Sequence, residues 1–151
     1  MDYNGIYPED INLFLRKFLE HVIDGKIPAP EYVVGCACGS SEIVMPLAGV
    51  LGADLGFIRR SHRRGDMEPR IVDEQEPAIR EGVEGSDTVC VEDYVCSSRS
   101  LFEVMKQVRE YNPSVIFGAS VNNSEPPSYL DRVVRKRKFH LFTMEDGCYG
   151  Y

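Results

Sequence analysis

The stretch Thr88-Val-Cys-Val-Glu-Asp-Tyr-Val-Cys-Ser-Ser-Arg-Ser-Leu101 decides the fold of this chain. It begins with a short apolar run, continues with two adjacent carboxylates, Glu92 and Asp93, and passes through small hydroxyl and thiol side chains into a helical pattern. This order predicts a buried strand, an acidic pair, an anion-binding loop and a helix N-terminus. A parallel strand delivers such residues to the carboxyl edge of a sheet, where α/β proteins bind their ligands. The implied ligand carries both hydroxyl groups and a phosphate.

The segments on either side alternate between helical and strand-like patterns. Apolar residues at helical spacing predict helices over 10–24, over 42–51 and from 101 to 108, and apolar runs predict strands at 32–36, 56–60 and 114–120. A further edge strand is expected at 70–72, an irregular acidic segment at 74–84, and a loop at 122–128. The alternation predicts an α/β fold with a parallel, Rossmann-like sheet. We expect one domain over residues 1–151.

The composition limits the partners of the chain. Its 151 residues carry 17 Lys and Arg against 24 Asp and Glu, for a net charge of -7. Such a balance argues against nucleic acid and against a membrane surface as partners, so an anion site requires a local concentration of Arg. No run of 18 apolar residues and no export leader is found, and the expected location is cytoplasmic.

The cysteines favour reduced thiols over a disulfide framework. The chain has 5 Cys, an odd number, and some of them lie inside apolar runs. Cys36 and Cys38 form a Cys-x-Cys pair, but the other Cys and the 3 His do not complete a standard zinc spacing. We interpret these thiols as core and loop residues.

Residues 89–100 resemble the phosphoribosyl pyrophosphate motif of the type I phosphoribosyltransferases, in which an apolar strand, two acids and two apolar residues precede a Thr- and Gly-rich phosphate loop. The resemblance implies that Glu92 and Asp93 hold the ribose hydroxyls and that Cys96, Ser97, Ser98, Arg99 and Ser100 wrap the 5′-phosphate. Cys96 stands where Thr is usual in the family. Ser98 stands where Gly is usual, and a positive φ there would be a mild strain.

Two upstream segments are similar to other parts of the same family. Residues 33–40, followed by a helix, resemble the loop that contacts the diphosphate, which gives Cys38, Gly39 and Ser40 that role, with Ser40 replacing the second glycine of the usual pair. Residues 57–66 resemble the strand and hood loop of the orotate branch. This match places Arg59 and Arg60 at the strand end and Arg63 on a loop that closes over the diphosphate. Guanidinium groups suit this leaving group, although a solvated basic segment is the alternative interpretation.

The resemblance covers residues 30–121 and implies an enzyme. It implies transfer of ribose 5-phosphate from phosphoribosyl pyrophosphate to a nitrogenous base, release of diphosphate, and Mg²⁺ as cofactor, with Asp93 reaching the metal through Mg-bound phosphoribosyl pyrophosphate. A homodimer is expected. Residues 1–29 and 122–151 are the candidates for the hood that holds the base. The Arg segment is most like the orotate branch, whereas the chain length is most like the small purine branch.

Three questions stay open at this point. The alternative function is a non-catalytic regulator or sensor with the same fold, binding phosphoribosyl pyrophosphate or a nucleotide, and a third possibility is that the ligand has been lost. The aromatic residues of the tail could contact a base, but Phe139 and Phe142 fit core or edge packing better because they occur in a strand-like pattern. The basic run over 132–138 fits a solvated face or strand edge, or a partner-binding surface.

Overall fold

The computed structural model describes residues 8–36, 41–58, 60–61, 70–71, 76–95, 99–123, 127–144 and 147–149, with the backbone alone at 41, 60–61, 70–71, 76, 93–95, 99–100, 122–123, 127 and 148–149. Within these residues a six-stranded sheet has the order β2-β1-β5-β6-β7-β8. Its members are β1 (Tyr32–Cys36), β2 (Asp54–Ile58), β5 (Asp87–Val95), β6 (Val115–Asn123), β7 (Leu141–Thr143) and β8 (Gly147–Tyr149). The first five are parallel and β8 is antiparallel to β7, which confirms the expected parallel sheet.

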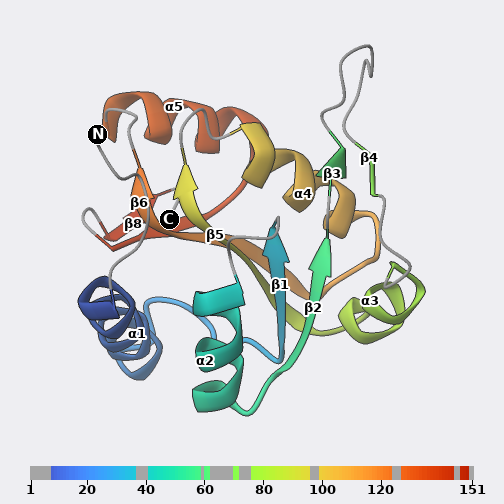
Figure 1. Cartoon of the computed structure of the whole chain (residues 1–151). Coiled ribbons are helices and arrows are strands. Elements are labelled where there is room, and N and C mark those ends of the chain that lie inside the picture. The colour runs from blue at the N-terminus through green and yellow to red at the C-terminus, as the bar shows by residue number, and fades with distance from the viewer. Residues whose placement is uncertain are drawn as a thin grey trace.

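Helices cover both faces of this sheet (Figure 1). They are α1 (Pro8–Ile23), α2 (Ser41–Leu51), α3 (Glu76–Val83), α4 (Arg99–Arg109) and α5 (Pro127–Arg137). The side chains of α1 and α2 pack in one apolar cluster, and those of α3, α4 and α5 pack in the other. A separate two-stranded sheet pairs β3 (Arg60–Ser61) with β4 (Arg70–Ile71).

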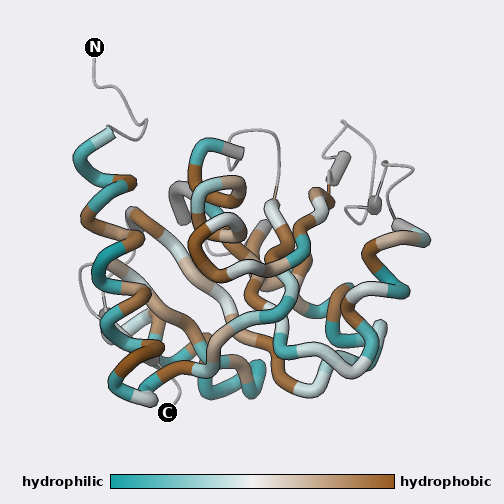
Figure 2. Tube along the Cα trace, turned by 90° about the horizontal axis from the view of Figure 1, so that it is seen from below, coloured by the Kyte–Doolittle hydropathy of each residue, from teal (hydrophilic) through white to brown (hydrophobic). Residues whose placement is uncertain are grey.

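The two clusters follow from the alternation of side chains along the strands. Val33, Val89 and Phe117 point to the α1–α2 face, whereas Val34 and Cys90 point to the α4 face. Both sets are buried, so the central strands are apolar on both faces, as expected for a parallel sheet covered by helices. In Figure 2 hydrophobic and hydrophilic residues alternate along α1. This pattern is typical of a helix that packs one face against a core.

Phe142 of β7 lies at the centre of an aromatic group under α1. Its ring centroid is 5.8 Å from that of Phe14 and 5.5 Å from that of Phe18, and Phe18 also stacks on Phe117 of β6 at 6.1 Å. Phe139 is also buried and stacks on Phe102 of α4 at 5.9 Å. The packing interpretation of Phe139 and Phe142 is therefore confirmed.

Some boundaries differ from the sequence predictions. The segment expected to be irregular at 74–84 contains α3, because Ile79 and Val83 lie one helical turn apart and bury the same face against the sheet. The second strand is Asp54–Ile58 and ends before the arginines. The strand expected at 114–120 continues to Asn123, and the basic run at 132–138 lies mostly on a helix, α5, not on a strand edge.

Other expectations agree with the structure. Cys36 and Cys90 are free, buried thiols, as predicted. None of the described helices combines the length and hydropathy needed to cross a membrane.

Two glycines inside helices give a matched pair of stability predictions. A Cβ added to Gly82 of α3 would lie 2.4 Å from Cε2 of Tyr32, a side chain only 5% exposed, whereas one added to Gly49 of α2 would meet no atom within 4 Å. We therefore expect Gly82→Ala to lower the free energy of unfolding by about 1–3 kcal/mol through overpacking. Gly49→Ala should raise it by about 0.5–1 kcal/mol, because alanine favours the helix. Urea denaturation measures both, and equal effects of the two substitutions would contradict the prediction.

Candidate functional site

Segments with predicted binding roles follow three neighbouring strands at the same edge of the sheet. In the sheet β1 lies between β2 and β5 and is parallel to both, and the three arrowheads point to the same side in Figure 1. Cys36 ends β1 and Ile58 ends β2, so the predicted diphosphate loop and the Arg segment both start at this edge. The acidic pair occupies the carboxyl end of β5. The fold thus brings together three segments that are far apart in the sequence.

β5 extends beyond its neighbour β1 at this edge. The last pair between β1 and β5 is Gly35 with Val91, whereas the pairing of β5 with β6 continues to Val95 and Asn123. The sequence predicted the acidic pair at the end of a short strand, but Glu92 and Asp93 lie within β5, because its pairing with β6 continues past them to Val95. Glu92 is half-buried, and the alternation of side chains puts it on the same face as Cys90, under α4.

Two helices begin at the same edge. α2 starts at Ser41, after the segment that follows β1, and α4 starts at Arg99, after the segment that follows β5. The N-terminus of a helix carries unpaired N–H groups and the positive end of the helix dipole. The carboxyl edge therefore offers carboxylates for hydroxyl groups beside two helix ends that favour phosphate.

The Arg segment, residues 57–66, includes one strand of a short antiparallel ladder. Arg60 pairs with Ile71 and Ser61 pairs with Arg70 in the antiparallel ladder of β3 and β4. This ladder lies just past the carboxyl end of β2 in the chain. The edge strand expected at 70–72 is confirmed as β4, although it pairs with β3 and not with the main sheet.

The structure describes the predicted site residues unequally. Glu92 is described with its side chain, and the backbone alone is described for Asp93, Arg60, Arg99 and Ser100. The remaining predictions lie outside the described residues: Cys38, Gly39, Ser40, Arg59, Arg63, Cys96, Ser97 and Ser98. The individual roles of all these side chains stay predictions.

The sequence reasoning missed two buried hydroxyl groups beside Glu92. Ser120 of β6 is in register with Glu92, and Thr143 of β7 is in register with Ser120. Their exposed fractions are 0% and 1%. Glu92, Ser120 and Thr143 each have an interaction partner, so this polar row across three strands is accommodated within the protein at the carboxyl edge. Polar residues near the ends of successive strands could have revealed this row.

The described side chains allow a metal only together with ligand oxygens. Within the described ranges no three His, Cys, Asp or Glu side chains lie close enough to hold an ion. Carboxylate oxygens nevertheless suit Mg²⁺, which keeps several waters or phosphate oxygens in its shell. The carboxylate of Glu92 is thus compatible with an Mg²⁺ ion that arrives on a phosphorylated ligand.

Cys90 lies two residues before Glu92 but has no role as a nucleophile. Burial raises the pKa of its thiol far above the usual range, which keeps the group protonated. Its exposed fraction is 0%, and it packs in the cluster under α4.

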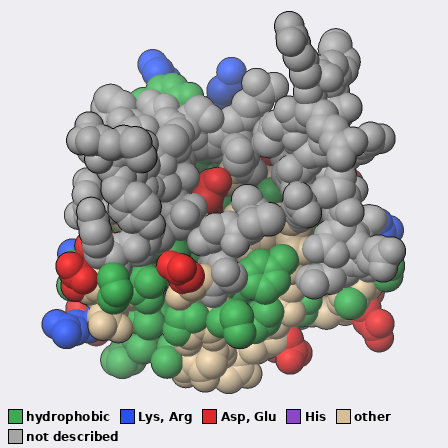
Figure 3. Space-filling model, in the orientation of Figure 1, with side chains coloured by type: hydrophobic (Ala, Val, Ile, Leu, Met, Phe, Trp, Pro, Cys, Tyr) green, Lys and Arg blue, Asp and Glu red, His purple; other side chains and the backbone are tan. Residues whose placement is uncertain are grey.

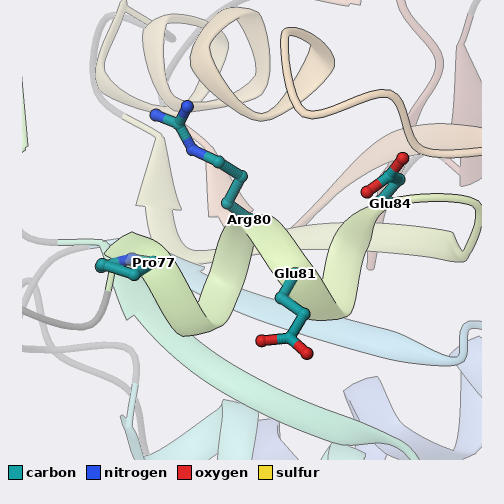
Figure 4. A pocket seen from close by; sticks show the side chains of 4 residues that line it. All are labelled: Pro77, Arg80, Glu81 and Glu84. Carbon is teal, nitrogen blue, oxygen red and sulfur yellow. The ribbon is translucent and has the colours of Figure 1, made fainter.

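A cavity of about 510 Å³ lies along α3, away from the acidic pair, and is lined by Pro77, Arg80, Glu81 and Glu84. Figure 4 shows that the side chains of Arg80 and Glu81 leave the helix in opposite directions. The Arg80 guanidinium stacks over the ring of Tyr111 at 4.8 Å. Because the charges of this cavity are mixed and do not converge, it is a weaker candidate than the carboxyl edge.

The comparisons with known proteins bear on the fold and the family of the chain. No curated protein sequence matches the chain. The chain resembles the crystal structure of a purine phosphoribosyltransferase from Pyrococcus horikoshii, with a TM-score of 0.64, 19% identity, and coverage of 80% of this chain and 76% of that one. It also resembles an orotate phosphoribosyltransferase from Aeropyrum pernix, with a TM-score of 0.65, 16% identity, and coverage of 91% and 70%.

A third structural neighbour is a hypoxanthine phosphoribosyltransferase from Staphylococcus aureus, with a TM-score of 0.61, 16% identity, and coverage of 80% and 65%. These likenesses establish the fold and leave the branch open. The family model of the phosphoribosyl transferase domain matches residues 8–142, a span that includes the sheet's five parallel strands up to Phe142 of β7. The chain therefore belongs to the type I phosphoribosyltransferase domain family.

Proposed function

We propose that this protein is an enzyme that transfers ribose 5-phosphate from phosphoribosyl pyrophosphate to a nitrogenous base. The observation that carries the proposal is that β2, β1 and β5 lie side by side and end at one edge of the sheet, where the acidic pair lies and where the predicted diphosphate loop and the Arg segment begin. Membership of the family supports the same reaction. The bond from the anomeric carbon to diphosphate breaks, diphosphate leaves with the electron pair, and a ring nitrogen of the base forms the new bond.

The chain's own residues hold and orient the donor. Glu92 and Asp93 accept hydrogen bonds from the two ribose hydroxyls, and their negative charge stabilises the positive charge that develops on the ribose ring. The segment over 96–100 binds the 5′-phosphate at the N-terminus of α4. Cys38, Gly39 and Ser40 contact the diphosphate.

The arginines act on the leaving group. Arg59 and Arg60 neutralise the diphosphate as its charge grows, and Arg63 closes over it to exclude water. A bound Mg²⁺ supplies additional positive charge to the diphosphate oxygens.

Two further parts of the proposal are the hood that holds the base and the interface of a homodimer. Residues 1–29 and 122–151 remain the candidates for the hood, although α1 packs its aromatic face on the sheet core. A homodimer is supported by the apolar side chains at the surface of α2 and β2, where Met45 is 60%, Val50 55% and Leu55 38% exposed. Figure 3 shows apolar side chains gathered on the part of the surface where α2 lies in Figure 1.

The test is diphosphate release by the purified full chain with Mg²⁺, phosphoribosyl pyrophosphate and a panel of purines, pyrimidines and orotate. Activity with one base class, at least 100-fold above that of the Asp93→Asn variant, is the expected result, because loss of one charge-stabilising group costs about 10²–10³ in rate. Release no faster than in the variant, for every base, would overturn the enzyme proposal.

The alternative is a regulator that binds the same ligand without turnover. The substitutions at Cys96 and Ser98 in the phosphate loop favour it, because a side chain at a Gly position changes the backbone available to phosphate. Calorimetry with phosphoribosyl pyrophosphate separates the two. Tight binding without diphosphate release identifies a regulator, and absence of binding indicates a fold that has lost its ligand.

A further inference from the structure

A second group of positive charges lies where the C-terminal ends of α4 and α5 meet. A cavity of about 350 Å³ is lined there by Glu103, Lys106, Arg109, Arg137 and Phe139. α4 connects β5 to β6 and α5 connects β6 to β7, and these strands are parallel. The C-terminal ends of both helices therefore lie at the amino edge of the sheet, opposite the acidic pair. α4 has 11 residues, so about 16 Å of helix separates the two ends.

The guanidinium group of Arg109 is held in place from two sides. It donates hydrogen bonds to the carbonyl oxygens of Arg137 at 3.4 Å and Lys138 at 2.9 Å, and it stacks over the Phe139 ring at 3.9 Å. Two N–H groups make these bonds, which leaves others of the five for a ligand. Arg109 is therefore preorganised, and ordering it costs a ligand little.

The other charges at the cavity do not cancel. Arg137 forms an ion pair with Glu103 at 3.5 Å, with side-chain exposures of 37% and 24%. Lys106 is exposed and, among the residues that the structure describes, has no ion-pair or hydrogen-bond partner. Three cations thus face one carboxylate at the cavity. Lys106 and Arg109 both lie in the last turn of α4, where the negative end of the helix dipole favours cations, and Arg109 in addition bonds to carbonyl groups.

We propose that this cavity binds a small polyphosphate anion, such as the triphosphate group of a nucleotide, through Lys106, Arg109 and Arg137. Guanidinium forks and an ammonium group suit phosphate oxygens. The cavity volume lies at the small end of ligand pockets, and the net charge of -7 opposes a long polyanion, so a small ligand is favoured over nucleic acid. The ring of Phe139 lies between Arg109 and Phe102, so the phosphates carry the recognition.

The test is a titration of the ¹⁵N-labelled full chain with ATP, with inorganic triphosphate and with adenosine, followed by amide chemical shifts. We expect ATP and triphosphate to shift the amides of 103–109 and 137–139, and adenosine to leave them unchanged. Equal affinity for the two anions identifies free polyphosphate as a sufficient ligand, and tighter binding of ATP identifies the nucleotide. This readout distinguishes the cavity from the carboxyl edge and does not depend on the proposed transfer reaction.

Two variants and a control sharpen the result. Lys106→Glu should weaken binding at this cluster at least tenfold, and Arg137→Gln should weaken it similarly because one of the three cations that bind the phosphates is lost. Lys26→Glu makes the same charge change in the turn after α1 and should bind like wild type. The proposal fails if the cluster does not respond to about 10 mM of either anion, if adenosine shifts it equally, or if all three variants bind alike.

Discussion

Replacing Glu92 by Gln is expected to lower kcat/KM for phosphoribosyl pyrophosphate by about 100-fold or more. The substitution keeps the size of the side chain and removes its charge. Glu92 is half-buried in β5 beside the buried Ser120, so its charge is less screened than that of a surface carboxylate. Steady-state diphosphate release, measured with the base that wild type uses, gives the ratio.

The matched control is Glu110→Gln, an exposed carboxylate just after α4 at the opposite edge of the sheet. Its activity should equal that of wild type, and both variants should unfold at similar urea concentrations. Retention of more than a third of the activity by Glu92→Gln would show that this carboxylate does not stabilise the transition state. If wild type only binds, the same comparison is made on the dissociation constant from calorimetry.

Replacing Phe142 by Ala is expected to lower the free energy of unfolding by about 3–5 kcal/mol. The ring is fully buried and meets Phe14, Phe18 and His21, whose ring centroids lie 5.8, 5.5 and 5.0 Å away. Its loss leaves a cavity between α1 and the sheet and removes edge-to-face contacts. For a domain of this size the midpoint of thermal unfolding should fall by about 10 °C.

Leu13→Ala on α1 is the control, because this side chain is 37% exposed and should cost less than about 1 kcal/mol. Phe142→Leu should lie between the two, since it fills part of the cavity. A loss below 1 kcal/mol for Phe142→Ala would mean that α1 does not depend on this aromatic group for its attachment.

Much of the fold could be predicted because its signals are local. The strand at 32–36 has the expected bounds, and α1, α2 and α4 lie within two residues of theirs, because apolar spacing reports which face of a helix is buried. α3 was not predicted because the segment is rich in acidic residues and its apolar pattern consists of only two residues, Ile79 and Val83. The burial of these two side chains depends on the sheet beneath them. The length of β5 was missed because it depends on pairing with β6.

The candidate site, like the fold, could be predicted from the sequence only in part. The sequence by itself identified the family and supplied the candidate site residues, since a motif is a run of neighbouring residues. Only the tertiary structure placed β1 between β2 and β5, set Ser120 and Thr143 in register with Glu92, and gathered Lys106, Arg109 and Arg137 at the far end of α4. Strand order and helix packing join residues distant in the chain, and no local pattern encodes which of them will meet.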